Sequence, residues 1–386
     1  MTFPLQQGQV RPRPPQNRSQ AFEGVHPLMP FASGSQKFQP LPDPLGPPPY
    51  HYDLKSAVPD IDQRAKNGLI FHMMGDTGGI KTPDKQMAVA AAMKGDLIDA
   101  AHAPAFFYHL GDVIYYNGQI SEYYSQFYEP YDHYTPPIIS IPGNHDGDPI
   151  NAQQKSLDGW VRYFMTSAPH INPESHDAPR ATMSLPNVYF TLLCPFVTIV
   201  GMYTNVPEHG SIDSIQQQWL THELATADPN KALIVAMHHP IYSFDNHHGG
   251  SPRMADALQQ AINDSRRVPN LVAAAHVHNY QRVERTLVKG STTPFLVVGT
   301  GGYYHLHSLN IDKTARGPIT DPITQATLVA HDDTSHGYAT ITVDSDHISG
   351  VITLVAEGKQ AANKQFDKFQ YSAKALKLPD GVTISL

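Results

Sequence analysis

Five short polar segments, each directly after an apolar run, constrain the fold of this 386-residue chain more than any other feature. Short apolar runs bounded by glycine or proline predict buried strands, and α/β sheets place their chemistry just beyond the carboxyl ends of such strands. We therefore expect the polar side chains to meet and to surround a pair of metal ions. The segments are Gly75-Asp76-Thr77-Gly78, Gly111-Asp112-Val113-Ile114-Tyr115, Gly143-Asn144-His145-Asp146, His238-His239-Pro240 and Ala275-His276-Val277-His278.

The first two segments both place Gly-Asp after a predicted strand. Glycine allows a tight turn, so Asp76 and Asp112 can approach a ligand closely. Taken alone, each aspartate also fits an ordinary turn. Tyr115 lies three residues after Asp112, where a phenolate would be a hard ligand that favours a trivalent ion. The alternative for Tyr115 is a ring packed on the sheet.

The third segment, Gly-Asn-His-Asp, is the most specific of the five. The side-chain oxygen of Asn144 is a neutral hard ligand, and His145 would then point past the metals towards a substrate. The alternative is a turn in which Asn144 has a left-handed backbone.

Histidine dominates the last two segments, and imidazole is a common ligand of first-row transition metals. His238 and His239 are adjacent, so they point in opposite directions if the strand geometry persists. We expect only His238 to reach the metals. His276 and His278 lie two residues apart at a strand end, which would put both rings on one face.

A further pair, His247 and His248, follows Asn246 in a glycine-containing loop before a predicted helix. A surface histidine pair is the alternative there. Each of these motifs has a purely structural explanation when it is taken alone. Five of them in one order, each at a strand end, favour a metal centre.

The composition excludes several classes of function. The net charge is -8 with histidine neutral, and no dense Lys/Arg run is present, which argues against a nucleic-acid or anionic membrane surface. The single cysteine, Cys194, excludes an intramolecular disulfide and a cysteine-based metal cage. The chain does not begin like a signal peptide, and its most apolar segment, 188–203, is interrupted by Pro195. A soluble, cytoplasmic protein is the default expectation.

Three regions differ in composition. Residues 1–66 are rich in Pro, Gln and Ser and predict a disordered or extended arm. The alternative is an arm that wraps its own domain or a neighbouring subunit, anchored by Phe22, Leu28, Phe31 and Tyr50. Residues 67–357 form the predicted catalytic domain, and residues 358–386 a polar C-terminal tail.

Strands and helices alternate within the central region, which predicts α/β architecture. Thr82 and Ser251 each precede a proline, a pattern typical of a helix N-cap. Residues 338–354 read as a terminal hairpin. The other predicted strands are 69–74, 105–110, 138–141, 232–237, 271–275 and 295–298, and the predicted helices are 83–101, 215–225 and 252–262.

The order of the five motifs, over about residues 68–354, resembles the purple acid phosphatases, a branch of the calcineurin-like metallophosphoesterases. Two features carry the likeness to this branch. The first motif is Gly-Asp-x-Gly rather than Asp-x-His, and Tyr115 is present. Three features depart from the family: Ala275 replaces a usual glycine, a short proline-rich arm stands in place of the N-terminal domain of the large plant-type enzymes, and the secretion signal usual in the family is not evident. The resemblance is therefore to a minimal, single-domain form.

The resemblance implies a two-sheet sandwich flanked by helices (α/β/β/α) and two metal sites that share a bridging carboxylate. The implied ligands of a ferric ion are Asp76, Asp112, Tyr115 and His278. The implied ligands of a divalent iron, zinc or manganese ion are Asp112, Asn144, His238 and His276. The residues implied to contact phosphate or to protonate the leaving group are His145, His247 and His248.

The predicted reaction is hydrolysis of a small-molecule phosphate ester, most simply a monoester, by a metal-bound hydroxide. We expect an acidic to near-neutral pH optimum, as for an acid phosphatase. Two alternatives stay open. One is a phosphodiesterase or nucleotide pyrophosphatase on the same metals. The other is a non-catalytic scaffold with the arm as its interaction element, although all seven ligand positions are filled.

Overall fold

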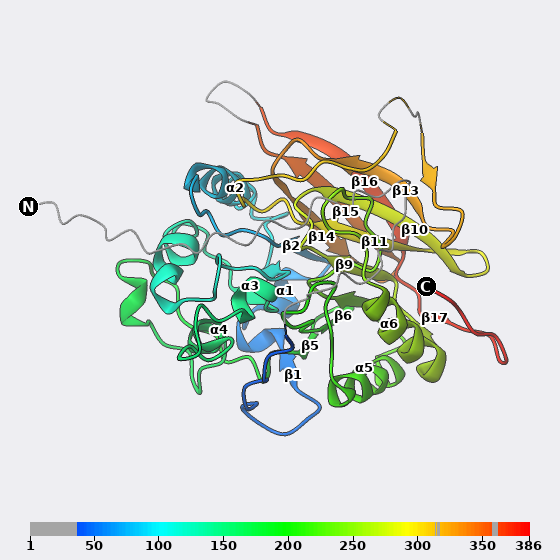
Figure 1. The fold of residues 1–386 in the computed structure, drawn as a ribbon, viewed down its shortest axis with the longest axis horizontal. Coiled ribbons are helices and arrows are strands. Elements are labelled where there is room, and N and C mark those ends of the chain that lie inside the picture. Colours follow the sequence, from blue (N-terminus) through cyan, green and yellow to red (C-terminus); the bar gives the residue numbers. More distant parts are fainter. Residues whose placement is uncertain (1–36, 313, 315–316, 357–361) are drawn as a thin grey trace, which may run out of the picture.

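The computed structural model describes residues 37–312, 314, 317–356 and 362–386. Within these residues a nine-stranded and a six-stranded sheet occupy the centre, flanked by helices (Figure 1). The strand order is β1-β5-β6-β7-β9-β11-β10-β13-β12 in the larger sheet and β16-β15-β14-β2-β3-β4 in the smaller one, and β17 pairs with β8 separately. The predicted α/β fold of two sheets flanked by helices is confirmed.

The larger sheet consists of β1 His51–Asp53, β5 Phe190–Leu193, β6 Val197–Gly201, β7 Ala232–Ala236, β9 Leu271–Ala274, β11 Ser291–Val298, β10 Tyr280–Val288, β13 Thr327–Asp332 and β12 Ile319–Thr320. The smaller sheet consists of β16 Lys364–Ser372, β15 His347–Leu354, β14 Gly337–Val343, β2 Leu69–Met74, β3 Phe107–His109 and β4 Ile138–Ser140. The remaining pair is β8 Arg267–Val268 and β17 Leu376–Lys377. The α-helices are α1 Ile61–Arg64, α2 Pro83–Gly95, α3 Asn144–Gly147, α4 Asp158–Phe164, α5 Ser214–Thr226 and α6 Pro252–Ser265.

Parallel strands bring the five polar segments together. Strands β2, β3 and β4 are parallel in the smaller sheet, and β6, β7, β9 and β11 are parallel in the larger one. Their carboxyl ends therefore lie on one edge of each sheet. Side chains of both sheets belong to one continuous buried apolar cluster, which fixes the two edges relative to each other.

The helix starts follow the proline pattern, but only one of the two predicted caps forms. Ser251 accepts a hydrogen bond from the first turn of α6, as predicted. Thr82 makes no side-chain cap bond, and α2 begins at Pro83, whose ring presets the backbone angle of a first helical turn. Helix α2 ends at Gly95, before the predicted end at Ala101, because glycine is a poor helix former. Among the described helices, none combines the length and apolarity needed to cross a bilayer.

Part of the predicted arm lies on the protein's own domain. Strand β1 pairs in parallel with β5, and the Trp219 Nε1–H donates to the Pro49 carbonyl at 2.8 Å. The ring of Tyr50 packs edge-on against Tyr189, with centroids 5.5 Å apart. These contacts fit the wrapping alternative for residues 37–66. The proposed anchors Phe22, Leu28 and Phe31 lie outside the described residues.

The predicted polar tail is wrong as a description of residues 364–372. They form β16, which pairs antiparallel with β15 along its length. The Phe369 ring lies on Gly350, where a Cβ atom would come within 2.1 Å of it. Most other β16 side chains are exposed or half-buried, as expected of an edge strand, so the segment has a polar composition. The sheet therefore extends beyond the predicted domain boundary at residue 357.

Candidate metal centre

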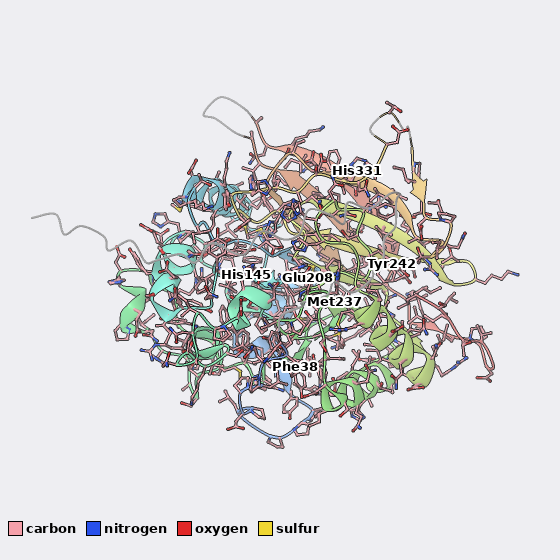
Figure 2. The ribbon with its side chains drawn as sticks, viewed as in Figure 1. Phe38, His145, Glu208, Met237, Tyr242 and His331 are labelled. Atoms are coloured by element: carbon pink, nitrogen blue, oxygen red, sulfur yellow. The ribbon has the colours of Figure 1, made fainter. Side chains whose placement is uncertain are left out.

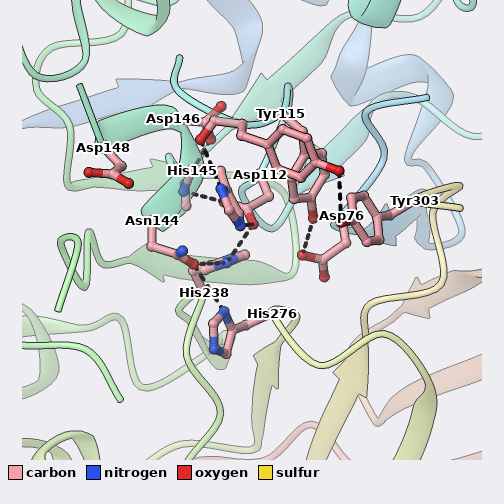
Figure 3. Close-up of polar contacts among 12 residues, drawn as sticks. Asp76, Asp112, Tyr115, Asn144, His145, Asp146, Asp148, His238, His276 and Tyr303 are labelled. Carbon is pink, nitrogen blue, oxygen red and sulfur yellow. Dashed lines mark hydrogen bonds and ion pairs between the residues drawn. The ribbon is translucent and has the colours of Figure 1, made fainter. Parts of the chain in front are cut away.

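Side chains from the ends of β2, β3, β4, β7 and β9 converge on one buried site (Figure 3). The close-up shows Asp112 between two groups of donors. Asp76 and Tyr115 lie on one side of it, and Asn144, His238 and His276 lie on the other. Two groups of donors on either side of one carboxylate are the geometry that the predicted pair of metal ions would need.

The first group gathers around the Tyr115 hydroxyl. This hydroxyl donates to Asp76 Oδ1 at 2.9 Å and lies 3.3 Å from His278 Nε2. The distance from His278 Nε2 to Asp76 Oδ1 is 3.6 Å. His278 Nδ1 lies 3.1 Å from the His305 carbonyl, a contact in which the ring donates. Its Nε2 therefore remains the nitrogen that faces this group.

The second group gathers around the Asn144 side-chain oxygen. His238 Nε2 lies 3.1 Å from it, and His276 Nδ1 lies 3.0 Å from it. His238 Nδ1 contacts the Leu110 carbonyl at 2.9 Å, which fixes Nε2 as the inward nitrogen. His239 Nδ1 contacts the Thr204 hydroxyl at 2.7 Å and its ring packs against that of His276, with centroids 4.3 Å apart, whereas His238 Nε2 is the nitrogen that faces the Asn144 oxygen.

A cation fits between these groups. Asp76, Asp112 and His238 each offer one ligand atom, and these atoms lie within 4.8 Å of one another. Asp76 Oδ2 is buried and has no hydrogen-bond partner within the described residues. A buried carboxylate oxygen without a partner is costly unless a cation compensates it. Carboxylate, amide, phenol and imidazole ligands together suit iron, zinc or manganese.

The pKa shifts of these buried groups also favour a bound cation. Burial raises the pKa of Asp76 to about 7 and, together with the Asp76 carboxylate, holds the pKa of Tyr115 well above its usual range. Burial would lower the pKa of His238, but the Asp112 carboxylate raises it to about 9. Buried acids without enough positive charge favour their neutral forms, and a bound cation would stabilise the ionised forms.

Three predicted ligands adopt a left-handed backbone: Asp76 at φ 57, Asp112 at φ 53 and His276 at φ 66. Such a conformation costs on the order of 1 kcal/mol for each non-glycine residue and is concentrated at functional sites. The prediction that His276 continues a strand is wrong, because β9 ends at Ala274. The left-handed turn, rather than strand alternation, aims the His276 ring at Asn144.

Of the three predicted catalytic histidines, two lie close to the ligand groups. His145 Nε2 is 4.0 Å from Asp112 Oδ2, and His145 Nδ1 contacts the Tyr116 carbonyl at 2.8 Å. His248 lies with its ring centroid 4.5 Å from that of His276. His247 is exposed, and its ring centroid is 6.2 Å from that of His248.

Sequence reasoning missed two carboxylates that hold these histidines. Glu208, which is labelled in Figure 2, belongs to the loop between β6 and α5 and lies 2.8 Å from His248 Nδ1. Asp245 Oδ2 accepts the backbone N–H groups of His247 and His248, both at 2.8 Å. An aspartate two residues before a histidine pair is a turn signal that could have identified Asp245. Glu208 has no comparable motif around it.

An aromatic neighbour completes the site. The Tyr303 ring centroid lies 4.2 Å from that of Tyr115 and 4.4 Å from that of His278. Tyr303 therefore covers the first ligand group. Its sequence neighbourhood, Gly301-Gly302-Tyr303-Tyr304, lies just after β11, another parallel strand of the larger sheet.

Known proteins share this fold. A purple acid phosphatase from yellow lupin (Lupinus luteus) seeds has a TM-score of 0.57 at 19% identity, covering 79% of this chain and 54% of that one, so this chain spans about half its length. GAP50, the anchor in the inner membrane complex of Plasmodium, has a TM-score of 0.52 at 14% identity, covering 78% and 89%. At these identities the likeness shows the fold. The family model for calcineurin-like phosphoesterases matches residues 53–280, more than half of the chain. The chain belongs to the calcineurin-like phosphoesterase family.

Proposed function

We propose that this protein is a dinuclear-metal phosphate-ester hydrolase, and more closely an acid phosphatase of the purple acid phosphatase type that cleaves monoesters. One observation carries the proposal: seven predicted ligands from five strand ends meet in one buried site, with Asp112 between two groups. Family membership and the lupin fold support it.

The donor sets determine which residues would hold each ion. Two cations bound there would neutralise charge on a phosphate group and acidify a water molecule. The first set includes the Tyr115 phenol, a hard donor that favours ferric iron. The residues of the first set are Asp76, Asp112, Tyr115 and His278. The residues of the second, divalent set are Asp112, Asn144, His238 and His276.

The protein's own contribution is to fix these groups before a substrate binds. Carbonyl acceptors on the outer nitrogens of His238 and His278 hold both rings in one orientation. His145 is held in the same way by the Tyr116 carbonyl. A histidine held beside the phosphate can donate a proton to the departing alkoxide. We assign this role to His248, with His145 and His247 contacting the phosphate.

The test combines metal analysis with two substrates. We expect about two metal ions per chain and faster hydrolysis of 4-nitrophenyl phosphate than of bis(4-nitrophenyl) phosphate, with the highest rate below neutral pH. Asp112→Asn should lose both the metals and the activity, whereas the exposed control Asp346→Asn should keep both. A preference for the diester would make the protein a phosphodiesterase. A metal-loaded protein inactive on both esters would favour the scaffold.

A further inference from the structure

One carboxylate oxygen joins the proton donor to the metal ligands. Glu208 Oε1 lies 2.8 Å from His248 Nδ1 and 3.7 Å from His276 Nε2. We propose that Glu208 is a positioning residue that orients both rings at once, so that His248 delivers its proton beside the divalent metal ion. This inference rests on the proposed phosphatase function and assigns a role to one further residue of that site.

The two nitrogens of each ring support this role. His276 Nδ1 faces the Asn144 oxygen at 3.0 Å, so Nε2 is the nitrogen that faces Glu208. At 3.7 Å the Glu208 oxygen does not hydrogen-bond to His276 Nε2 and acts on that ring through its charge, because a carboxylate behind a metal-binding imidazole raises the basicity of the ring. An ionised carboxylate can only accept, so the Glu208 contact places a proton on His248 Nδ1. Exchange of a proton with a substrate then takes place at His248 Nε2.

Both ends of the Glu208–His248 contact are anchored by other parts of the fold. The carbonyl of His209, the next residue, accepts a hydrogen bond from the hydroxyl of Ser251, the N-cap of α6. His248 is held through its backbone N–H by Asp245 Oδ2 at 2.8 Å. The ring contact therefore joins two loops that are each fixed to the scaffold. Such second-layer support holds a catalytic group in its productive geometry.

A third cation is the competing explanation. Glu208, His248 and His276 each offer a ligand atom, and these atoms lie within 4.8 Å of one another. A metal there would bind His276 Nε2 while Nδ1 binds the divalent ion, so the imidazole would have to lose both of its ring protons. The 2.8 Å distance between Glu208 Oε1 and His248 Nδ1 is that of a hydrogen bond. The geometry therefore favours a hydrogen-bonded positioning residue.

The test varies the leaving group. Protonation matters most for an ester with a poor leaving group, such as an alkyl phosphate, and least for 4-nitrophenyl phosphate. We expect Glu208→Ala to lower kcat on the alkyl ester by about 10- to 100-fold, and on the nitrophenyl ester by about 3-fold or less. Glu208→Gln, which keeps an acceptor oxygen, should recover much of the loss. In a His248→Ala background, adding Glu208→Ala should lower kcat on the alkyl ester only slightly further.

Glu223 supplies a matched control. Its buried carboxylate also accepts from a histidine, His51 Nε2 at 2.8 Å, but it lies on α5 at the edge of the larger sheet. Glu223→Ala should leave the ratio of the two rates unchanged. An equal loss on both esters in Glu208→Ala would overturn the positioning role, and so would a third metal ion per chain that this variant loses.

A second readout does not depend on activity. Nitrogen NMR of the histidine rings, assigned with His248→Ala, should show the proton on Nδ1 of His248 in the metal-free protein. Its loss in Glu208→Ala would support the contact, and a wild-type ring protonated only at Nε2 would overturn it. An inactive wild type with the Nδ1 proton in place would instead defeat the proposed phosphatase function.

Discussion

The hydroxyl of Tyr115 lies 2.9 Å from Asp76 Oδ1, although the two residues follow different strands of the smaller sheet. His278 Nε2, from the larger sheet, lies 3.3 Å from the same hydroxyl. Three donors of different chemistry thus meet at one point from both sheets. The proposed ferric ion would bind at this point.

Tyr115→Phe should abolish the visible absorption of the iron-loaded protein, because a phenolate ligand is needed for charge transfer to ferric iron. Iron should still bind, since Asp76, Asp112 and His278 remain. Absorption spectra and metal analysis of the same sample check both expectations. Tyr303→Phe is the control, because its ring packs on Tyr115 at 4.2 Å without being a predicted ligand. An unchanged band in Tyr115→Phe would exclude the phenolate assignment.

Gly143→Ala should damage the centre without removing any ligand. A Cβ atom at Gly143 would lie 2.2 Å from Asp112 Oδ1 and 2.4 Å from the Asp112 backbone nitrogen, so Asp112, the proposed bridging ligand, must move. We expect weaker metal binding, lower phosphatase activity and a loss of about 1–3 kcal/mol in the free energy of unfolding.

Gly95→Ala is the matched control for that change. A Cβ at Gly95, in the last turn of α2, meets nothing within 4 Å. Alanine there should keep the metals and raise stability by up to about 1 kcal/mol. Metal titration and urea unfolding of both variants make the comparison. Normal metal affinity in Gly143→Ala would mean that Asp112 tolerates displacement and is not a tightly placed bridge.

The sequence predicted the strand ends well because each apolar run is short and is followed by glycine or proline. Asp76 and Asp112 follow their strands as expected, and the structure brings their carboxylates close to His238. The predicted pairing of His276 and His278 on one face rested on strand alternation. A left-handed residue broke that alternation, and no local signal marks a histidine that will adopt one.

Long-range contacts were harder to predict. Glu208 lies 40 residues from His248 in sequence, and only the packing of two loops brings them together. Strand β16 was missed because an edge strand keeps polar side chains on its exposed face, which resembles the composition of a tail. In both cases the structure depends on a partner that is distant in sequence. Hydrophobic periodicity reports only on neighbouring residues.

The buried ring of His109 should make the free energy of unfolding depend on pH. Its ring is buried on β3, with Nδ1 accepting the Gly111 N–H at 3.2 Å and Nε2 lying 2.8 Å from the Thr77 hydroxyl. Burial lowers its pKa to about 3, whereas an unfolded histidine titrates near about 6.5. The unfolded state therefore binds the proton first. The stability contributed by neutral His109 is complete above about pH 6.5 and is lost as the pH falls towards 3.

Replacement by a residue that does not titrate should reduce this dependence. In His109→Asn, the decline of unfolding free energy below about pH 6.5 should be shallower by up to about 1.4 kcal/mol per pH unit. Urea unfolding at about pH 7.5 and about pH 5.5 measures the difference. His102→Asn, at an exposed histidine, should keep the wild-type slope. Equal slopes in all three proteins would show that the buried ring does not carry the effect.

Asp367 links the two sheets. It lies in the segment that was predicted from the sequence to be a polar tail. It lies on β16 of the smaller sheet, and Arg282 lies on β10 of the larger one. The guanidinium of Arg282 reaches both carboxylate oxygens, with Nε at 2.7 Å and Nη2 at 3.1 Å. The Tyr280 hydroxyl donates to the same carboxylate at 2.7 Å. The aspartate thus binds one buried partner, Tyr280, and one largely buried partner, Arg282, whose Nη1 also lies 2.6 Å from Glu284 Oε1.

Asp367→Ala should lower the free energy of unfolding by about 2 kcal/mol, because it removes the two-oxygen partner of a largely buried guanidinium and leaves Glu284 as its remaining counter-charge. Asp346→Ala is the control. It breaks an ion pair of the same length, 2.7 Å to Lys374, but both side chains are more than half exposed, so solvent and salt screen the interaction and stability should change little. Denaturant unfolding of both variants tests this. If the two losses were equally small, β16 would be only loosely attached to the domain. A large loss confined to Asp367→Ala would mean that the C-terminal strand stabilises the packing of the two sheets, whose edges carry the predicted metal ligands.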